Sequence, residues 1–455
     1  MYFPVQMCVS MLLDIKSLVK VAFTSLFFAV VSAEPPAEPR QVWIFGDSQS
    51  DNGNLSILLA NDGIDDTFLE DEPYIPYMPT GVAEDLITLQ RITTGPTVAE
   101  IIAASCFGGN QVSLPSLLVS VVGPLAANNY AVAGALVDTT SPEDFPDQVA
   151  RLTFPLDLAY QIRRFAANTA EGGIIQPDDV AIVALGGNDA FRAWQATLEG
   201  GGDVSIGFAF IDRAVDTLRA FTAGSGGFVP LVDAIEDDVP SLSELGIDEF
   251  VFFQIPNLGL TPFVRGIAAT APSPGDVLDL ATAMSDYFNV KLVTLVNEIQ
   301  LKGYTVTVVP TERATRSVYQ EFQDFGFANG LDACFLLNPL LLGAAPGVFN
   351  EGCTNETVES YLWVDPIHGT GNFYRIVAEL AMQELECQAK TDEEMPSKDD
   401  ATKSSSKVMT GVKMSKSSMT MMKSYKSIMS SKSSEKMMRR KQMMMTMIRK
   451  GKGFR

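Results

Sequence analysis

Four short apolar runs, spaced along most of the chain, constrain its fold more than any other feature. Each is followed directly by a glycine or a proline, and they cover residues 42–45, 179–185, 249–255 and 304–309. Residues 276–301 carry apolar side chains at helical spacing, and residues 371–386 predict a closing helix. Strands that alternate with helices in this way predict an α/β domain with a parallel sheet.

The 455 residues divide by composition into one central domain and three flanking parts. The domain is predicted over residues 41–388, and it contains no internal repeat. Within it, the stretches 60–95 and 195–230 are rich in glycine and acidic residues and are predicted to be loops or insertions. The flanking parts are a signal peptide, a short linker and a disordered tail rich in Lys, Ser and Met, predicted over residues 1–33, 34–40 and 389–455.

The amino-terminal leader has the pattern of a secretory signal. Lys16 and Lys20 precede an apolar run over residues 21–31, and small residues follow at 31–33. A membrane-spanning helix needs about 20 apolar residues, so this run is too short for one; an uncleaved anchor is the alternative. No later stretch is long and apolar enough for a membrane helix. We therefore predict a secreted, extracellular protein.

The cysteines agree with an oxidising compartment. Besides Cys8 in the leader there are four, an even number, and no C-x-x-C spacing that would indicate zinc binding or redox chemistry. Four cysteines allow three pairings, of which we expect Cys334–Cys353, which closes a short loop, and then Cys106–Cys387.

Two sequons, at Asn54 and Asn355, predict an N-glycosylated protein. The first lies next to the candidate active site described below, and this position argues against its use.

The net charge of −22 is unevenly distributed along the chain. Residues 401–455 hold 15 basic groups and one acid, whereas residues 1–400 hold 18 basic and 54 acidic groups. This excess of acidic groups over residues 1–400, the body of the protein, argues against binding nucleic acid through its main surface. The tail is predicted to be a disordered basic extension. The alternatives are that it binds an anionic polymer, a membrane surface or a mineral, or that it folds back on the body.

His368 is the only histidine in the chain, which excludes multi-histidine metal sites. A serine nucleophile needs a base, usually an imidazole oriented by a carboxylate. Asp365 lies three residues before His368, and Ser48 follows the first apolar run. Ligands gather beyond the carboxyl ends of the strands in such sheets, so Ser48 stands where a nucleophile would be expected. Alone, the Asp365–His368 pair could instead be a structural pair in a surface loop.

Three groups are candidates to stabilise an oxyanion: the backbone N–H groups of Ser48 and Gly134 and the side-chain amide of Asn188. Asn188 follows the second apolar run, as Ser48 follows the first. The structural alternatives are that Gly134 is a turn glycine and that Asn188 caps a helix. Such chemistry requires neither a metal nor an organic cofactor.

The segment 45–54, with Phe-Gly-Asp-Ser-Gln-Ser-Asp-Asn-Gly-Asn, resembles the first sequence block of the GDSL (SGNH) lipases and esterases. Four further segments resemble other parts of that family in the family's order, namely residues 129–135, 186–189, 254–262 and 365–368. The resemblance implies a flavodoxin-like, three-layer α/β/α fold. It also implies roles by position. Ser48 would be the nucleophile, His368 the general base and acid, and Asp365 the group that orients His368. Ser48, Gly134 and Asn188 would form the oxyanion hole.

The chain departs from the family pattern at three positions. Gln49 replaces the leucine of the family name, which does no chemistry. Ala133 stands where the family often has a first glycine before Gly134, and Gly369 replaces a common proline, which would loosen the loop after the histidine. Asp47 and Asp189 are interpreted as structural supports.

The sequence thus predicts a secreted serine hydrolase that cleaves carboxylic esters of a lipid, a phospholipid or an acetylated polysaccharide through an acyl-enzyme. Acyl transfer by the same residues is one alternative, and a non-catalytic extracellular matrix or surface protein with a basic binding tail is another. The apolar stretch 335–342 could line an acyl pocket, although core packing is the favoured interpretation.

Overall fold

The computed structural model divides into two units, residues 1–40 and 41–455, and the fold described here belongs to the second. The structure describes residues 40–61, 76–77, 89–90, 93–108, 113–119, 127–137, 157–170, 175–176, 178–224, 239–335, 349–385 and 387. The predicted signal peptide and tail lie outside the described residues, as does the linker apart from its last residue.

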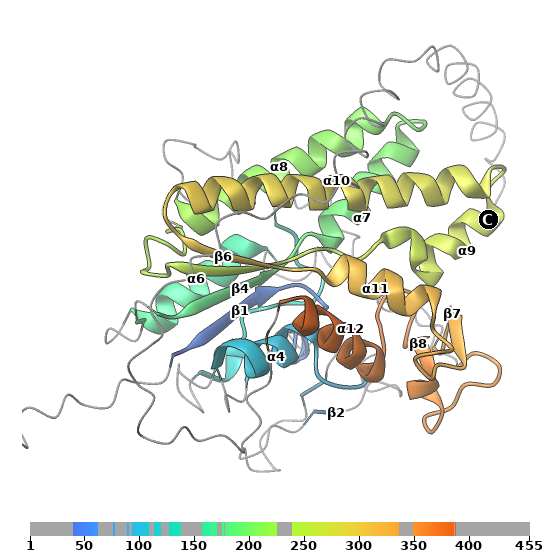
Figure 1. Ribbon diagram of the computed structural model, residues 1–455, viewed down its shortest axis with the longest axis horizontal. Helices are drawn as coiled ribbons and strands as arrows, with labels where there is room; N and C mark the ends of the chain where they lie inside the picture. Colours follow the sequence, from blue (N-terminus) through green and yellow to red (C-terminus); the bar gives the residue numbers. More distant parts are fainter. Residues whose placement is uncertain are drawn as a thin grey trace, which may run out of the picture. The chain divides into compact units, whose positions relative to one another are not determined.

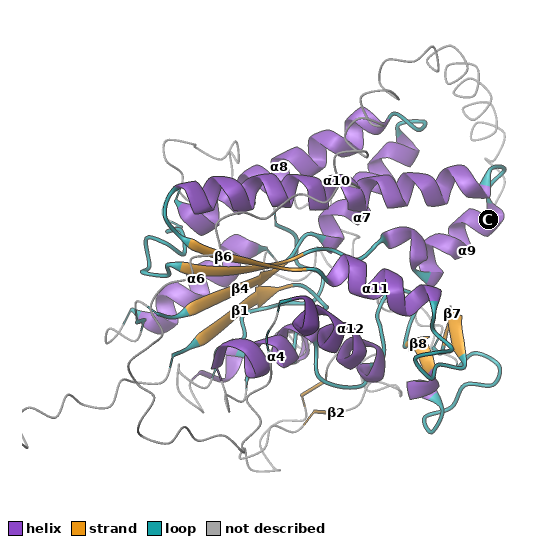
Figure 2. Cartoon of the chain, viewed as in Figure 1, coloured by secondary structure: helices purple, strands orange, loops and turns teal. Residues whose placement is uncertain are grey.

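The centre of the domain is a parallel sheet of four strands (Figure 2). The strands lie in the spatial order β1 (Val42–Gly46), β4 (Val180–Ala184), β5 (Glu249–Phe253) and β6 (Thr305–Val309). They coincide with the four apolar runs, so the predicted parallel sheet is confirmed.

A further segment, residues 128–132, extends the sheet along the other edge of β1. The N–H of Ile44 donates to the carbonyl of Asn128 at 2.9 Å, and the N–H of Tyr130 donates to the carbonyl of Ile44 at 2.7 Å. The N–H of Val132 then donates to the carbonyl of Gly46 at 3.1 Å. With this segment counted as the second strand in chain order, the spatial order is 2-1-3-4-5, the flavodoxin-like arrangement. The chain turns from β1 to one side of the sheet for the segment 128–132 and to the other side for β4. The topological switch point therefore lies between the carboxyl ends of β1 and β4.

The strands β1, β4 and β5 are buried on both faces, which is why they are apolar at successive positions, whereas the edge strand β6 is only partly buried. Trp43 and Phe45 point into one core, whereas Val42 and Ile44 point into the other. The first core is covered by α6 (Leu158–Thr169), α7 (Gly187–Glu199), α8 (Val204–Ala223), α9 (Pro262–Thr270) and α10 (Pro274–Leu301). The second is covered by α4 (Val98–Ile102), α11 (Thr311–Gln320) and α12 (Gly371–Glu384) (Figure 1). The result is the expected three-layer α/β/α fold.

The remaining elements are short and lie in the connections. They are α2 (Asn54–Asn61), the π-helical turn η1 (Ala103–Gly108), the 3₁₀ turns η2 (Ser116–Leu118), η4 (Leu258–Leu260) and η6 (Val358–Ser360), and two pairs of strands, β2 (Pro76–Tyr77) with β3 (Leu89–Gln90) and β7 (Asn329–Ala333) with β8 (Tyr361–Trp363).

The prediction of loops over residues 195–230 is wrong for most of that stretch. Helix α7 continues to Glu199 and α8 occupies Val204–Ala223. Only residues 200–203, between the two helices, form a turn. The side chain of Asp203 caps α8 by accepting from the N–H of Ser205. Apolar side chains on one face of α8, among them Ile211 and Leu218, are buried in the first core. Their helical spacing outweighs the glycine content of the flanking turns.

The two predicted helices, residues 276–301 and 371–386, are observed as α10 and α12. The two expected disulfides are also present. Cys106–Cys387 joins η1 to the chain just after α12, and Cys334–Cys353 joins the end of β7 to the connection that leads to β8. Among the described residues, none of the helices has the length and apolarity needed to cross a membrane.

Candidate active site

Ser48 lies at the carboxyl edge of the sheet because β1 ends in a tight turn. Directly after the strand, the N–H groups of Ser50 and Asp51 donate to the carbonyl of Asp47 at 3.0 and 2.9 Å. Only glycine suits position 46, because a Cβ there would lie 2.7 Å from the Cβ of Ser50. Ser48 is 9 % exposed, so its hydroxyl is largely enclosed by the site.

His368 and Asp365 lie in the loop between β8 and α12. The Asp365 Oδ1 accepts the backbone N–H groups of Ile367 and His368 at 2.7 and 2.8 Å, which folds the loop around the carboxylate. Asp365 Oδ2 lies 2.7 Å from His368 Nδ1, and His368 Nε2 lies 2.8 Å from Ser48 Oγ. Both Asp365 and His368 are buried. The three predicted side chains, 320 residues apart at the extremes, therefore form one continuous hydrogen-bonded series.

This geometry defines which proton can move. A carboxylate accepts only, so the Asp365 oxygen holds the histidine tautomer with its proton on Nδ1. The His368 Nε2 is then the acceptor for the Ser48 hydroxyl proton. Serine becomes a nucleophile when such a base takes its proton.

Both backbone polar groups of Gly369 are held by side chains, contrary to the loosening expected from the absence of proline there. Its N–H donates to the hydroxyl of Tyr374 at 3.2 Å, a bond that proline could not make. Its carbonyl accepts from the hydroxyl of Thr93 at 3.1 Å. A Cβ at position 369 would lie 2.2 Å from the Phe373 ring. The roles of Thr93 and Tyr374 were not predicted, because nothing in the sequence brings Thr93 close to this loop.

The other two oxyanion candidates lie beside the Ser48 turn. Gly134 is exposed in a turn with φ +83°, as the turn alternative required. Asn188 lies in the first turn of α7, not at its N-cap, which is Gly186. The Asn188 Nδ2 donates to the carbonyl of Ala135 at 2.8 Å, which ties α7 to the segment of Gly134. One amide hydrogen makes that bond, and an amide has two.

Asp51 joins the Ser48 turn to the same segment. Its carboxylate accepts the backbone N–H groups of Gly53, Asn54 and Leu55 at 2.8, 2.7 and 3.1 Å. It also accepts the N–H of Ala133 at 2.8 Å. Burial raises the pKa of Asp51, while these bonds act in the opposite direction. Asp189 acts similarly at the start of α7, since its oxygens accept the N–H of Val137 at 3.1 and 3.0 Å.

The two sequons have opposite surroundings. The Asn54 amide is fully buried and donates to the carbonyls of Asn129 and Ala131, both at 2.9 Å. It is thus inaccessible in the folded domain. Asn355 is exposed.

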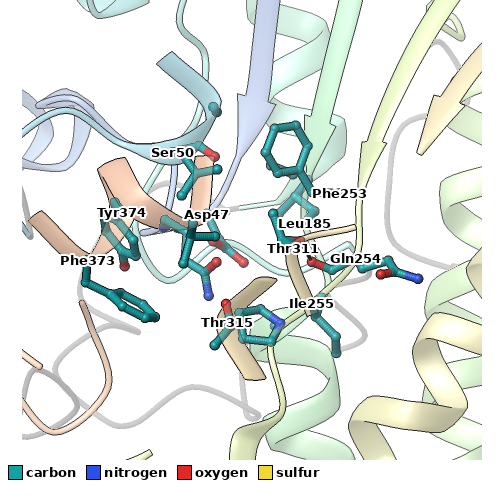
Figure 3. Close-up of a pocket in the computed structure, with 17 residues that line it drawn as sticks. Asp47, Ser50, Leu185, Phe253, Gln254, Ile255, Thr311, Thr315, Phe373 and Tyr374 are labelled. Atoms are coloured by element: carbon teal, nitrogen blue, oxygen red, sulfur yellow. Dashed lines mark hydrogen bonds between the residues drawn. The ribbon is translucent and has the colours of Figure 1, made fainter. Parts of the chain in front are cut away.

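A small pocket opens beneath the turn, between the carboxyl ends of β4 and β5 and the helices α11 and α12 (Figure 3). Asp47 and Gly187, the neighbours of Ser48 and Asn188, contribute to its wall. Among the described residues, no cluster of three or more His, Cys, Asp or Glu side chains could hold a metal ion.

A serine, a histidine and an aspartate in hydrogen-bonded series, at the carboxyl edge of a parallel α/β/α sheet, are the arrangement found in serine hydrolases. Comparison with sequence models of protein families matches residues 42–381 to the family described as GDSL-like Lipase/Acylhydrolase. The chain belongs to this family, and it is a carboxylic ester hydrolase.

Comparison with solved structures finds Axe2, an acetylxylan esterase from Geobacillus stearothermophilus, at 13 % sequence identity and a TM-score of 0.31. The alignment covers 76 % of this chain and 94 % of that one. A substituted form of the same esterase aligns at 13 % identity and a TM-score of 0.30, covering 77 % and 95 % of the two chains. Likenesses this distant carry no argument about substrate. A search of curated proteins found no match.

Proposed function

We propose that the protein is a secreted hydrolase that cleaves carboxylic esters through an acyl-enzyme formed on Ser48. The observation that carries this proposal is the 2.8 Å contact between Ser48 Oγ and His368 Nε2, with Asp365 behind the imidazole. Residues 41–388 are the proposed catalytic domain. The family membership supports ester cleavage, and the geometry supports a serine nucleophile.

The reaction proceeds in two halves. Ser48 Oγ attacks the ester carbonyl carbon while its proton passes to His368 Nε2, and Asp365 stabilises the imidazolium that forms. The N–H groups of Ser48 and Gly134 and the amide of Asn188 stabilise the oxyanion. The carbon–oxygen bond to the alcohol then breaks, and the alcohol takes the proton from Nε2. Water repeats the sequence against the acyl-enzyme and releases the acid.

The substrate class remains one of three: an ester of a lipid, of a phospholipid or of an acetylated polysaccharide. Acyl transfer to an alcohol uses the same residues, and product analysis with an added alcohol separates it from hydrolysis. Of the stretch 335–342, Phe335 is buried against Phe349, with ring centroids 5.3 Å apart, which supports core packing at this position. Residues 336–342 lie outside the described residues.

Secretion is supported by the leader pattern and by the two disulfides, which persist in oxidising compartments. In such a compartment the exposed Asn355 is the proposed glycosylation site.

A fluorophosphonate probe tests the nucleophile without knowledge of the substrate. We expect the wild type to be labelled on Ser48, because His368 activates that hydroxyl. Peptide mapping by mass spectrometry identifies the modified residue. A non-catalytic surface protein would not react, so an unlabelled but folded wild type would contradict the proposed function.

For the tail, we propose electrostatic attachment to an anionic polymer, membrane surface or mineral. Residues 401–455 hold 15 basic groups and one acid, so the net charge of the tail is positive, whereas that of residues 1–400 is negative. We expect the full chain to adsorb to anionic vesicles or silica at low salt and to be released at high salt. Deletion of residues 401–455 should abolish adsorption and leave esterase activity intact. Adsorption that survives the deletion would contradict the proposal.

A further inference from the structure

Asp47 has a second role besides forming the turn that carries Ser48. Its Oδ1 accepts the N–H of Gln49 at 3.1 Å, inside that turn. The backbone of Gly187, the first residue of α7, lies near enough to the same carboxylate to lower its pKa. Its Oδ2 faces Gly187 so closely that a Cβ there would lie 3.4 Å from it. One carboxylate thus lies between the turn of Ser48, to which it is hydrogen-bonded, and the helix end that presents Asn188.

We propose that Asp47 is a positioning residue whose ionised carboxylate locks the Ser48 turn to the first turn of α7 and so holds the oxyanion hole together. This inference rests on the proposed function, because it concerns the donors assigned to Ser48 and Asn188. Those donors belong to different elements, and separating them by about 1 Å would weaken catalysis.

The charge of Asp47 also acts on the proposed base. His368 and Asp47 attract each other, since a protonated His368 lowers the pKa of Asp47. By reciprocity, an ionised Asp47 stabilises the imidazolium that forms when Ser48 attacks. Asp365 supports the same imidazolium through direct contact, whereas Asp47 acts from beneath the turn without a bond to the ring.

The surroundings of Asp47 make its ionisation sensitive to pH. Burial raises its pKa to about 6, against the opposing effects of the Gln49 N–H, of other nearby backbone groups and of His368. Tyr374 of α12 also lines the pocket and interacts electrostatically with both Asp47 and Asp365. The helix α4 contributes the uncharged side chains Val98 and Ala99 to the pocket wall. The helix α11 contributes Thr311 and Thr315 (Figure 3).

Protonation of Asp47 is expected to change the stability and the activity of the protein in opposite directions. Its folded pKa lies above the ordinary value of 3.8, so the native state binds this proton more readily than the unfolded state. Ionisation of Asp47 therefore lowers the free energy of unfolding as the pH rises from 3.8 to about 6, and that stability returns as the pH falls through the same range. Activity changes in the opposite direction, because a protonated Asp47 loses its charge and one of its acceptors.

The test is the pH profile of kcat/KM for Asp47→Asn on a short p-nitrophenyl ester. Asparagine keeps an acceptor for the N–H of Gln49 but removes the charge and the second acceptor. We expect kcat/KM at pH 8 to fall roughly 10²-fold. In the wild type, kcat/KM should fall on the acid side of the profile more steeply than the titration of one group allows, because Asp47 and His368 must both be deprotonated for activity. In Asp47→Asn this fall should have the slope of a single titration.

Asp179→Asn is the matched control. Asp179 is also buried and accepts backbone N–H groups, from Gln41 at 2.9 Å and Gln176 at 3.0 Å, but at the opposite edge of the sheet. We expect its folded fraction to keep wild-type kcat/KM and slope. Combining Asp47→Asn with Asn188→Ala should cost less than the product of the two separate losses, because Asp47 acts partly through Asn188.

Unchanged kcat/KM and slope in a folded Asp47→Asn variant would overturn the inference, and so would fully multiplicative losses with Asn188→Ala. Should Asp47→Asn not fold, the wild-type profile decides alone, since a single-proton acid limb also overturns it. The proposed function fails separately, when Ser48→Ala remains active.

Discussion

Ser48→Ala is expected to lower kcat by about 10⁴-fold to 10⁶-fold while the protein remains folded, as losses of triad nucleophiles do. His368→Ala should cost about as much, since without its base the hydroxyl 2.8 Å away keeps its proton. The double variant should be no worse than either single one, because the two residues act as one unit. Steady-state kinetics on short p-nitrophenyl esters, with circular dichroism to confirm folding, measures all three.

Ser50→Ala is the matched control for this experiment. Ser50 is a buried serine in the same turn, two residues after Ser48, but it is Ser48 that lies against His368. Alanine keeps the Cβ that packs beside Gly46. We expect near wild-type activity. Retained activity in Ser48→Ala, or equal losses in Ser48→Ala and Ser50→Ala, would contradict the assignment of the nucleophile.

Asp51→Ala is expected to lower the free energy of unfolding by about 4 kcal/mol, the largest effect on stability that we predict from a single side chain. The substitution leaves four backbone N–H groups without their acceptor in a site where Asp51 is 2 % exposed. Each such group costs about 1–3 kcal/mol when buried and unpaired, and neighbouring costs are not additive. Urea denaturation followed by circular dichroism measures the change.

The pH dependence of this difference has a predictable sign. The folded pKa of Asp51 is raised by burial, so its ionisation opposes folding. The advantage of the wild type over Asp51→Ala should therefore grow as the pH falls through the folded pKa of Asp51. Asp324→Asn, at an exposed position, should leave stability nearly unchanged. A loss no larger than that of Asp324→Asn would show that Asp51 does not hold the turn.

Much of the scaffold was predictable because its signals are local. An interior strand of a parallel sheet is buried on both faces, so β1 and β4 are visible as uninterrupted apolar runs. The turn residues that follow each strand mark the carboxyl edge, where Ser48 and Asn188 lie. Helix α8 was not predicted because glycine-rich segments flank it. Its apolar face stabilises the helix only through packing against the core, which the local sequence does not show.

The sequence by itself determined the strands and the family, and it predicted the serine, the histidine and the aspartate of the site, since each depends on residue types within a few positions of one another. Only the tertiary structure decided what those residues contact. It placed the sole histidine 2.8 Å from a serine 320 residues away, and it brought Thr93 to Gly369. It also placed Asp47 between the carboxyl end of β1 and the first residue of α7. Such contacts depend on how the crossovers pack on the sheet, and packing involves the whole domain at once, so no local pattern records it.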